Sequence, residues 1–511
     1  MLKRSSALAS VALVAITAGM AAPAWAETLQ EAIALAYRTN PTLLAQRANQ
    51  RALDESVPQA RAGLRPTIDV SATANYSRTD SPTETTPTGV DLDGDGVIDT
   101  VSTGGVVESD SGGASIGLSQ TLYSGGRIGH AIGAAEANVL EGRENLRAIE
   151  QQVLASVIQA YVDVQRDMEI LQIRQDNLAV LRRQLDESNA RFEVGEITRT
   201  DVAQSESRLA QSEADLANAQ AQLSVSRAAY AAVVGQAPTS LETPPALPGI
   251  PTDFDSALDI GLAENPSVRA AEYSLRAAES RVAAARSEYL PSARLTASYG
   301  GSDDLPSFDL TRRTSFQAGA SISVPLFTGG LNQSRVAQAL EQANAAQIGI
   351  ESQRRGVLQD VSSAYAQVIS TRAALTAGNE AVRAATVAAE GVRQEAQVGL
   401  RTTLDVLNQE LELRSAQVTL VSARRNEYVA QAQLLSAMGR LEGADLDPTI
   451  EVYDAEDNYN RVRGRGALPW DGVIEAIDRI AAPPVMPAAD APDAPIDAQL
   501  KSEVIQTAPA T

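Results

Sequence analysis

The sequence contains one pattern twice, and this internal repeat limits the fold more than any other feature. The first copy opens at Leu29–Ala36 and reaches Asn40-Pro41, while the second opens at Phe254–Gly261 and reaches Asn265-Pro266, an offset of 225 residues. Further along the chain the offset becomes 204, as between Gly125-Gly126 and Gly329-Gly330. A repeat of this size predicts two copies of one supersecondary unit.

The change of offset locates an insertion of 21 residues in the first copy, between Tyr76 and Ser115. Insertions collect in surface loops because a loop carries few packing contacts. The sequence therefore predicts a loop over residues 77–113, which lies outside the cell if the neighbouring strands cross a membrane.

Four segments alternate apolar and polar residues with a period of two, as half-buried strands do. They are Ile68–Tyr76, Ala114–Leu122, Ala293–Tyr299 and Phe316–Leu326. A tilted strand that crosses a membrane needs about 9–11 residues, which is close to their length. The alternative is a soluble sheet with one wet face. The small polar residues of the second face favour a water-filled lumen over a packed core.

Two segments without proline, residues 126–192 and 330–394, predict helices that each span roughly 100 Å at ~1.5 Å per residue. Apolar residues in 4-3 spacing from Val157 to Leu185 indicate coiled-coil packing. Four further segments, 28–64, 200–234, 255–289 and 402–438, predict helices about half as long. Two short helices end to end match one long helix, and this suggests the wall of a tube.

The first 26 residues have the features of a secretory signal: Lys3 and Arg4, an apolar run, and Ala24-Trp25-Ala26 before the cut. An uncleaved membrane anchor is the alternative. The division that we expect is a signal over 1–26, a first repeat over 27–237, a proline-rich linker over 238–253 and a second repeat over 254–439. A small region packed on the tube, 440–470, and an Ala/Pro-rich disordered tail, 471–511, complete it.

Composition excludes several classes of protein. The chain has no cysteine, which removes disulfides and thiol chemistry. Without Lys3 and Arg4, 40 basic residues face 64 acidic ones, and a net charge of −24 argues against nucleic acid as a partner. No apolar stretch after residue 27 is long enough for a membrane helix, so a membrane form of this chain needs a barrel.

Four strands cannot close a barrel, and unpaired edges are not tolerated in lipid. Two chains would give eight strands with a filled interior, whereas three chains give twelve and leave a passage. The sequence thus predicts an α+β membrane protein. Each chain would supply four transmembrane strands and part of a coiled-coil tunnel, and a trimer would form a 12-stranded β-barrel.

Several motifs together resemble the TolC family of outer-membrane efflux proteins. They are the repeated opening with Asn-Pro, the Gly-Gly strand exits, and the turns Val194-Gly195…Asp201-Val202 and Val398-Gly399…Asp405-Val406. The resemblance covers roughly residues 27–470. It implies a homotrimer in outer-membrane lipid with most of its mass in the periplasm. It also implies a periplasmic adaptor (membrane fusion protein) and an inner-membrane ABC or proton-driven exporter.

The absence of a cysteine for lipid attachment looks more like the type I secretion branch of this family than its lipoprotein branch. The resemblance also implies a closed entrance at the periplasmic turns. Arg401 of the second turn would be held by Asp201 of the first, with Thr200 as a second acceptor. The alternative is an ordinary surface ion pair, worth ~0–1 kcal/mol.

Asp405 matches a pore-lining aspartate of the family, and three copies would form a carboxylate ring that attracts cations. The alternative is a solvated helix carboxylate. The family's second aspartate ring falls on Asn408, and the tyrosine of its gate falls on Ala396, so the constriction is expected to be less negative. Gly195 and Gly399 are expected either to shape turns where an adaptor docks or simply to end helices.

An acidic motif in the insertion resembles an EF-hand calcium loop, with Asp91, Asp93, Asp95 and Asp99 as candidate ligands. Ser102 stands where that motif has its bidentate Glu, so weak calcium binding or a plain acidic loop is expected. No other cofactor is expected. His130, the only histidine, is expected to be structural, and no catalytic constellation accompanies it. The competing interpretation of the whole chain is a periplasmic coiled-coil structural or adaptor protein without a pore.

Overall fold

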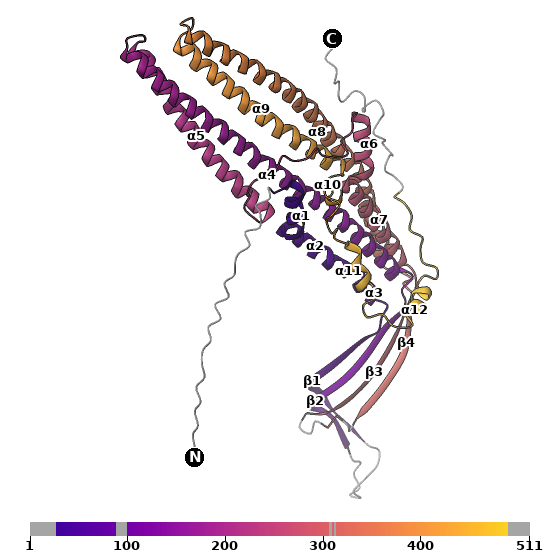
Figure 1. The fold of residues 1–511 in the computed structure, drawn as a ribbon. Helices are drawn as coiled ribbons and strands as arrows, with labels where there is room; N and C mark the ends of the chain where they lie inside the picture. The colour runs from indigo at the N-terminus through magenta and orange to yellow at the C-terminus, as the bar shows by residue number, and fades with distance from the viewer. Residues whose placement is uncertain (1–26, 88–99, 306–308, 311–312, 489–511) are drawn as a thin grey trace, which may run out of the picture.

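The computed structural model describes residues 27–87, 100–305, 309–310 and 313–488. Figure 1 shows an elongated molecule with long helices running side by side and a small sheet at one end. Two helical hairpins, α4–α5 and α8–α9, end in tight turns at the opposite end. Among the helices of the described residues, none is both long and apolar enough to cross a membrane.

The four predicted strands form one antiparallel sheet in the order β1-β2-β3-β4. The strands are β1 (Thr67–Pro87), β2 (Thr100–Tyr123), β3 (Ser292–Asp304) and β4 (Thr314–Ser323). Apolar side chains of this sheet face solvent within one chain: Val70 is 77% exposed and Ile322 75%. β1 and β4 lie at the two edges, so the sheet has both an uncovered apolar surface and two open edges.

The expected loop over 77–113 is wrong for most of its length, because β1 continues to Pro87 and β2 already begins at Thr100. Serine, threonine and acidic residues dominate this segment, and such a polar composition is typical of a loop. Threonine and valine nevertheless favour extended backbone, and Arg78 Nη1 lies 3.1 Å from Glu108 Oε1 across the strands. A strand of 21 residues reaches about 70 Å, beyond the hydrocarbon thickness of a bilayer.

Both long helices are confirmed at 67 residues: α4 (Arg127–Glu193) and α8 (Leu331–Gln397). Each follows a Gly-Gly pair with positive φ, such as Gly125 at 67° and Gly126 at 82°. A side chain at these positions would be strained, so the glycines allow the chain to turn sharply from strand to helix. The partner helices α5 (Arg199–Val234) and α9 (Thr403–Met438) have 36 residues each.

The continuous helices expected over 28–64 and 255–289 are broken in the structure. The first consists of α1 (Leu29–Thr39), α2 (Pro41–Asp54) and α3 (Ser56–Ala62), and the second of α6 (Phe254–Glu264) and α7 (Pro266–Ser287).

Asn40 and Asn265 cause the breaks at equivalent places. Each precedes a proline, which disfavours helical backbone, and each has φ −62° with ψ near 122–126°. The Asn40 side chain then caps α2, accepting from Thr42 N at 3.0 Å, and donates to Val233 O at 2.9 Å.

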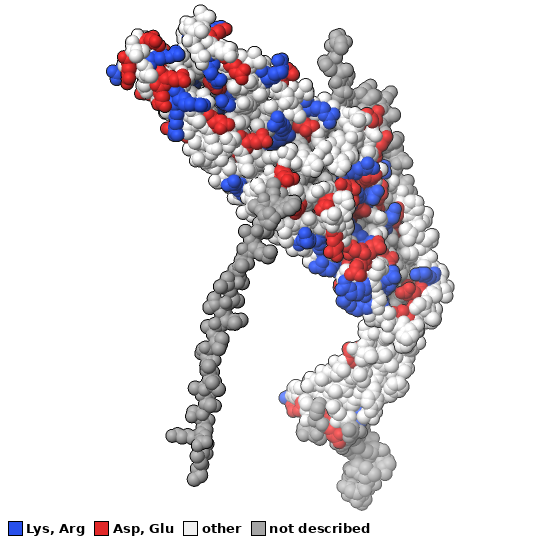
Figure 2. Space-filling model, in the orientation of Figure 1, with Lys and Arg blue, Asp and Glu red and all other residues white. Residues whose placement is uncertain are grey.

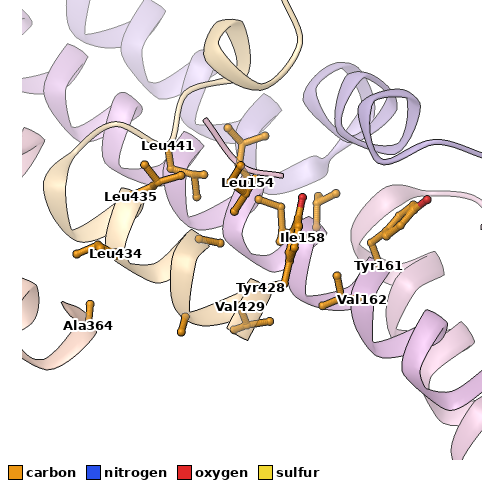
Figure 3. Close-up of a cluster of buried hydrophobic side chains, with 14 of the residues drawn as sticks. Leu154, Ile158, Tyr161, Val162, Ala364, Tyr428, Val429, Leu434, Leu435 and Leu441 are labelled. Carbon is orange, nitrogen blue, oxygen red and sulfur yellow. The ribbon is translucent and has the colours of Figure 1, made fainter. Parts of the chain in front are cut away.

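The largest core cluster lies midway along the body, where both hairpins meet the short helices. Leu154, Ile158, Tyr161 and Leu434 are at most 1% exposed, and Figure 3 shows side chains of α4 and α9 packed together there. Both halves of the chain contribute to this one cluster. It therefore fixes the two hairpins relative to each other.

The chain after the second repeat packs back on the body through short helices, α10 (Gly443–Leu446) and α11 (Ala455–Val462). The tail expected to be disordered from residue 471 instead begins with α12 (Asp471–Asp478). Asp478 is 1% exposed, and its Oδ1 accepts from Ser124 N at 2.5 Å and Ser124 Oγ at 2.8 Å. This short helix was not predicted, because the sequence that follows it is rich in alanine and proline. It lies at the junction of β2 and α4.

Packing of α4 on α2 gives a first prediction. A Cβ at Gly142 would lie 2.4 Å from Gln50 Oε1 and from Leu53 Cδ2. Gln50 cannot easily move, since its amide donates to Val139 O and Asp54 Oδ1. We expect Gly142→Ala to lower stability by about 1–3 kcal/mol through overpacking.

Gly133→Ala in the same helix is the control, because its Cβ would lie an ordinary 3.6 Å from Ser280 Oγ. Its higher helix propensity should leave stability unchanged or raise it by up to about 1 kcal/mol. Thermal unfolding of the purified protein at a fixed heating rate compares the two. Equal midpoints would contradict the packing of α2 on α4 described above.

Candidate entrance and gate

The two hairpin turns that the sequence singles out have the same local structure. Each helix after the turn begins with a capping box. In the first, Thr198 N donates to Asp201 Oδ2 at 2.9 Å, and Asp201 N donates to Thr198 Oγ1 at 3.4 Å. In the second, the matching distances for Thr402 and Asp405 are 3.0 and 3.2 Å. Asp201 and Asp405 therefore both fix the start of a helix.

Gly195 and Gly399 each have a φ of 80°, and a Cβ at either would meet nothing within 4 Å. The requirement for glycine is therefore the backbone conformation rather than space. Both turns lie at the far end of the body from the sheet (Figure 1). Docking of an adaptor at these turns stays a prediction.

Arg401 does not contact Asp201 within the chain. Its Nε donates instead to Glu395 Oε2 at 2.7 Å, across the Gly399 turn, and both side chains are about half exposed. Sequence analysis missed Glu395, because a pair six residues apart is recognised only once the turn between them is known. An Arg401–Asp201 or Arg401–Thr200 contact between chains stays a prediction.

The surroundings of this turn stabilise the charged forms of Arg401 and Asp405. The hydrogen bond with Glu395, and then the Glu395 charge, raise the pKa of Arg401. Hydrogen bonds from the backbone and hydroxyl of Thr402 lower the pKa of Asp405, and the charge of Arg401 lowers it further. Asp405 consequently keeps its negative charge at pH values somewhat below the usual range of a carboxyl group.

Asn408 takes part in a contact between the two hairpins. Arg208 Nη2 on α5 donates to Asn408 Oδ1 on α9 at 3.2 Å. Asn408, which the family resemblance assigns to the position of a second aspartate ring, is thus a hydrogen-bond acceptor within its own chain. Arg208 is a further residue of this region that sequence analysis missed.

Deeper in the hairpins, arginine–carboxylate pairs join the helices. Glu410, with a side chain only 3% exposed, pairs with Arg393 of α8 and, at 3.6 Å, with Arg414. Arg425 of α9 binds Asp163 of α4 with two bonds, at 2.7 and 3.2 Å. Bidentate pairs of this kind fix geometry as well as adding energy.

A crevice of about 460 Å³ lies between the hairpins near the turns. It is lined by α4, α8 and α9, with Arg183, Arg191, Arg393 and Arg414 among its residues. Figure 2 shows charged side chains of both signs gathered at the end of the α4–α5 hairpin. The turn end of the body therefore has many charged side chains.

The described residues contain no group of three or more His, Cys, Asp or Glu side chains placed to hold a metal ion. The candidate calcium ligands Asp91, Asp93, Asp95 and Asp99 lie outside the described residues, so that site stays a prediction. His130 lies at the start of α4, where burial lowers its pKa despite the nearby carboxylate of Asp478. Its surroundings are those of a packed side chain.

Known structures with this architecture are outer-membrane channels. The fold matches a membrane protein from Pseudomonas aeruginosa with a TM-score of 0.68 at 20% identity, over 83% of this chain and 92% of that one. It also matches the outer membrane protein VceC from Vibrio cholerae with a TM-score of 0.65 at 22% identity, over 80% and 96%. These matches show that the chain shares the fold of these two membrane proteins.

Sequence comparison then gives the family. Residues 32–236 and 257–440 match the model described as outer membrane efflux protein, and the chain belongs to this family. It is 33% identical to the outer membrane efflux protein BepC of Brucella suis over 450 residues, 88% of this chain and 92% of that protein. It is 29% identical to the outer membrane protein TolC of Vibrio cholerae, over 83% and 93%.

The resemblance drawn from the motifs is thereby confirmed, together with the assignment as an efflux channel of the outer membrane. The competing interpretation as a poreless periplasmic spacer is not supported. The family is one of transport channels rather than enzymes.

The Arg425–Asp163 pair gives a second prediction, and the neighbouring arginine supplies the control. Arg425 and Asp163 are 19% and 21% exposed, whereas Arg424 lies 3.8 Å from Glu169 with exposures of 55% and 43%. We expect Arg425→Ala to cost about 1.5–3 kcal/mol, and Arg424→Ala less than about 1 kcal/mol.

Thermal midpoints of both variants at low and high salt test this expectation. Only the small loss in Arg424→Ala should vanish at high salt, because exposed pairs are screened. If Arg425→Ala behaved like Arg424→Ala at both salt concentrations, the half-buried pair would not join the hairpins as described.

Proposed function

We propose that three copies of this chain form a continuous duct from the periplasm to the outside. Each chain would supply four strands to a 12-stranded barrel and two helical hairpins to a tunnel, one from each structural repeat. The duct conducts passively, and an inner-membrane ABC or proton-driven exporter supplies the energy. A periplasmic adaptor joins the exporter to the hairpin turns.

One observation carries this proposal: the sheet ends in two unpaired edges and exposes apolar side chains along its length. Unpaired backbone groups cost several kcal/mol each in hydrocarbon, so β1 of one chain needs β4 of another. Four strands per chain make twelve in a trimer, enough for an open passage, whereas a dimer would give a filled barrel. The helical body would add about 100 Å of tunnel.

The cargo is proposed as exported proteins or peptides, or drugs. The relatives include the alkaline protease secretion protein AprF of Pseudomonas aeruginosa, 26% identical over 61% of this chain, and efflux proteins such as BepC. A polar lumen would suit exported proteins or peptides as well as drugs.

The entrance is proposed to close at the turns through Arg401 and Asp405. Arg401 would bind Asp201 or Thr200 of a neighbouring chain. It would either give up its hydrogen bond to Glu395 or keep that bond and form the second contact as well. Asp405 would face the threefold axis. At ~6 Å and an effective dielectric constant of ~20, two such carboxylates repel by roughly 3 kcal/mol, which a multivalent cation would relieve. Because Asn408 stands at the position of the second aspartate ring, the entrance would carry less negative charge than one with two aspartate rings.

Single-channel recording of the mature protein in a planar bilayer tests the duct. We expect a small conductance in the closed form and a several-fold larger one in Arg401→Ala. Asp201→Asn should resemble Arg401→Ala, since it removes the charge while an amide oxygen still caps α5.

Glu395→Gln is the matched control, because it removes the partner of Arg401 within the chain. If Glu395→Gln opened the channel and Asp201→Asn did not, the contact within one turn would be the latch. A folded trimer without any conductance would remove the duct itself.

The carboxylate ring gives a separate prediction. Asp405→Asn should weaken block by a multivalent cation at least about tenfold, because three charges are lost while the cap is kept. Asp405→Ala should weaken the block equally and also lower stability by up to about 1 kcal/mol, because Thr402 N loses its acceptor in the capping box. Unchanged block in Asp405→Asn would place these carboxylates away from the axis.

A further inference from the structure

Glu27, the first described residue, is fixed by bonds from both its main chain and its side chain. It is only 6% exposed. Its Oε1 accepts from Tyr230 Oη at 2.6 Å and from Gln236 Nε2 at 2.8 Å. Its nitrogen donates to Ser240 O at 2.7 Å, and its carbonyl accepts from Tyr161 Oη at 2.8 Å.

This cluster joins three parts of the molecule at the core in the middle of the body. Tyr161 lies on α4, Tyr230 on α5, and Ser240 on the linker between the repeats. Tyr161 Oη also lies 2.7 Å from Glu242 O, and Glu27 pairs with Leu241 in a parallel bridge. The bonds made by Glu27 therefore hold the linker against both helices of the first hairpin.

In the part of the chain that the structure describes, no cation forms an ion pair with Glu27. Glu27 Oε2 is buried and has no hydrogen-bond partner among the described residues. The charged side chains that act on Tyr161 are Glu27, Glu31 and Glu242, all of them carboxylates. Burial, and then Glu27, raise the pKa of both tyrosines, so they act as neutral donors and supply no positive charge. A buried carboxylate without a cation is strongly unfavourable.

The sequence offers a cation at this place. Hydrolysis of the Ala26–Glu27 peptide bond by the protease that removes secretory signals would add a hydroxyl group to the Ala26 carbonyl. The Glu27 nitrogen would become an amine, which is protonated near neutral pH. This ammonium group has three N–H bonds. One would replace the present bond to Ser240 O, and the positive charge would lie on the same residue as the buried carboxylate.

We propose that the α-ammonium group of mature Glu27 is the counter-charge of this buried cluster, so that signal removal completes the core. In the unprocessed chain an amide would occupy this place, with one N–H and no charge. Processing would then favour the folded hairpin, which ties assembly to arrival in the periplasm.

The composition of the chain permits a direct test. Its lysines are Lys3 and Lys501, so a chain starting at Glu27 has only two primary amines: the N-terminus and Lys501. After N-terminal sequencing, the assembled protein in detergent is treated with an amine-reactive reagent and its labels are located by mass spectrometry. We expect label on Lys501 alone in the folded protein and on both amines after unfolding. An N-terminus other than Glu27, or equal labelling of both amines in the folded protein, would overturn the proposal.

A double-variant cycle separates the charge from packing. Ser-Gly placed before residue 27 moves the ammonium away, and Glu27→Gln removes the carboxylate while keeping an acceptor for Tyr230. The extension should lower the thermal midpoint by a few degrees in the parent protein and much less in the Glu27→Gln variant. Glu242→Gln is the control, since it removes a nearby exposed charge, and there the extension should act as in the parent.

An equal effect of the extension in the parent and in the Glu27→Gln variant would show that only bulk matters and would refute the ion pair. If Glu27→Gln did not assemble, the labelling result on the parent protein would still show whether the N-terminal amine is buried. Channel conductance enters neither experiment, so these outcomes are independent of the duct.

Discussion

The rule that every backbone N–H and C=O needs a partner in a medium without water governs this structure. The sheet of one chain meets that rule along β2 and β3 but not at its edges, β1 and β4. Its apolar residues, among them Ile68 and Phe316, point to solvent rather than into a core. A single chain is therefore an incomplete structure in the membrane, and the remaining partners have to come from outside it.

The helical body determines a second property of the molecule, which is its length. Each 67-residue helix has about as many residues as a 36-residue helix and a set of shorter helices together. The junction between the short helices coincides with the largest core cluster, to which both halves contribute. Positive-φ glycines at Gly126, Gly195, Gly330 and Gly399 confine the sharp changes of direction to the ends of the long helices.

The sequence predicted the long helices and the positions of the strands because their periodicity extends over many residues. It did not predict the breaks at Asn40 and Asn265, because the Asn-Pro pairs were used only to align the two repeats. The rule that a proline disfavours helical backbone in the preceding residue was not applied to them. The polar extension of β1 and β2 was missed because hydropathy does not separate a solvated strand from a loop. The partners of Arg401 and Asn408 were missed because they are set by contacts between elements.

The local structure around the two turn aspartates would constrain the proposed gate. In each capping box one carboxylate oxygen, Oδ2, accepts both the backbone N–H and the hydroxyl of the preceding threonine. The other oxygen makes none of these bonds and is held in a fixed direction by them. A carboxylate oriented in this way needs no further ordering when a cation or a neighbouring arginine arrives, so less conformational entropy opposes the contact. In the proposed gate, the cap that begins the helix would thereby orient the charges at which the entrance closes.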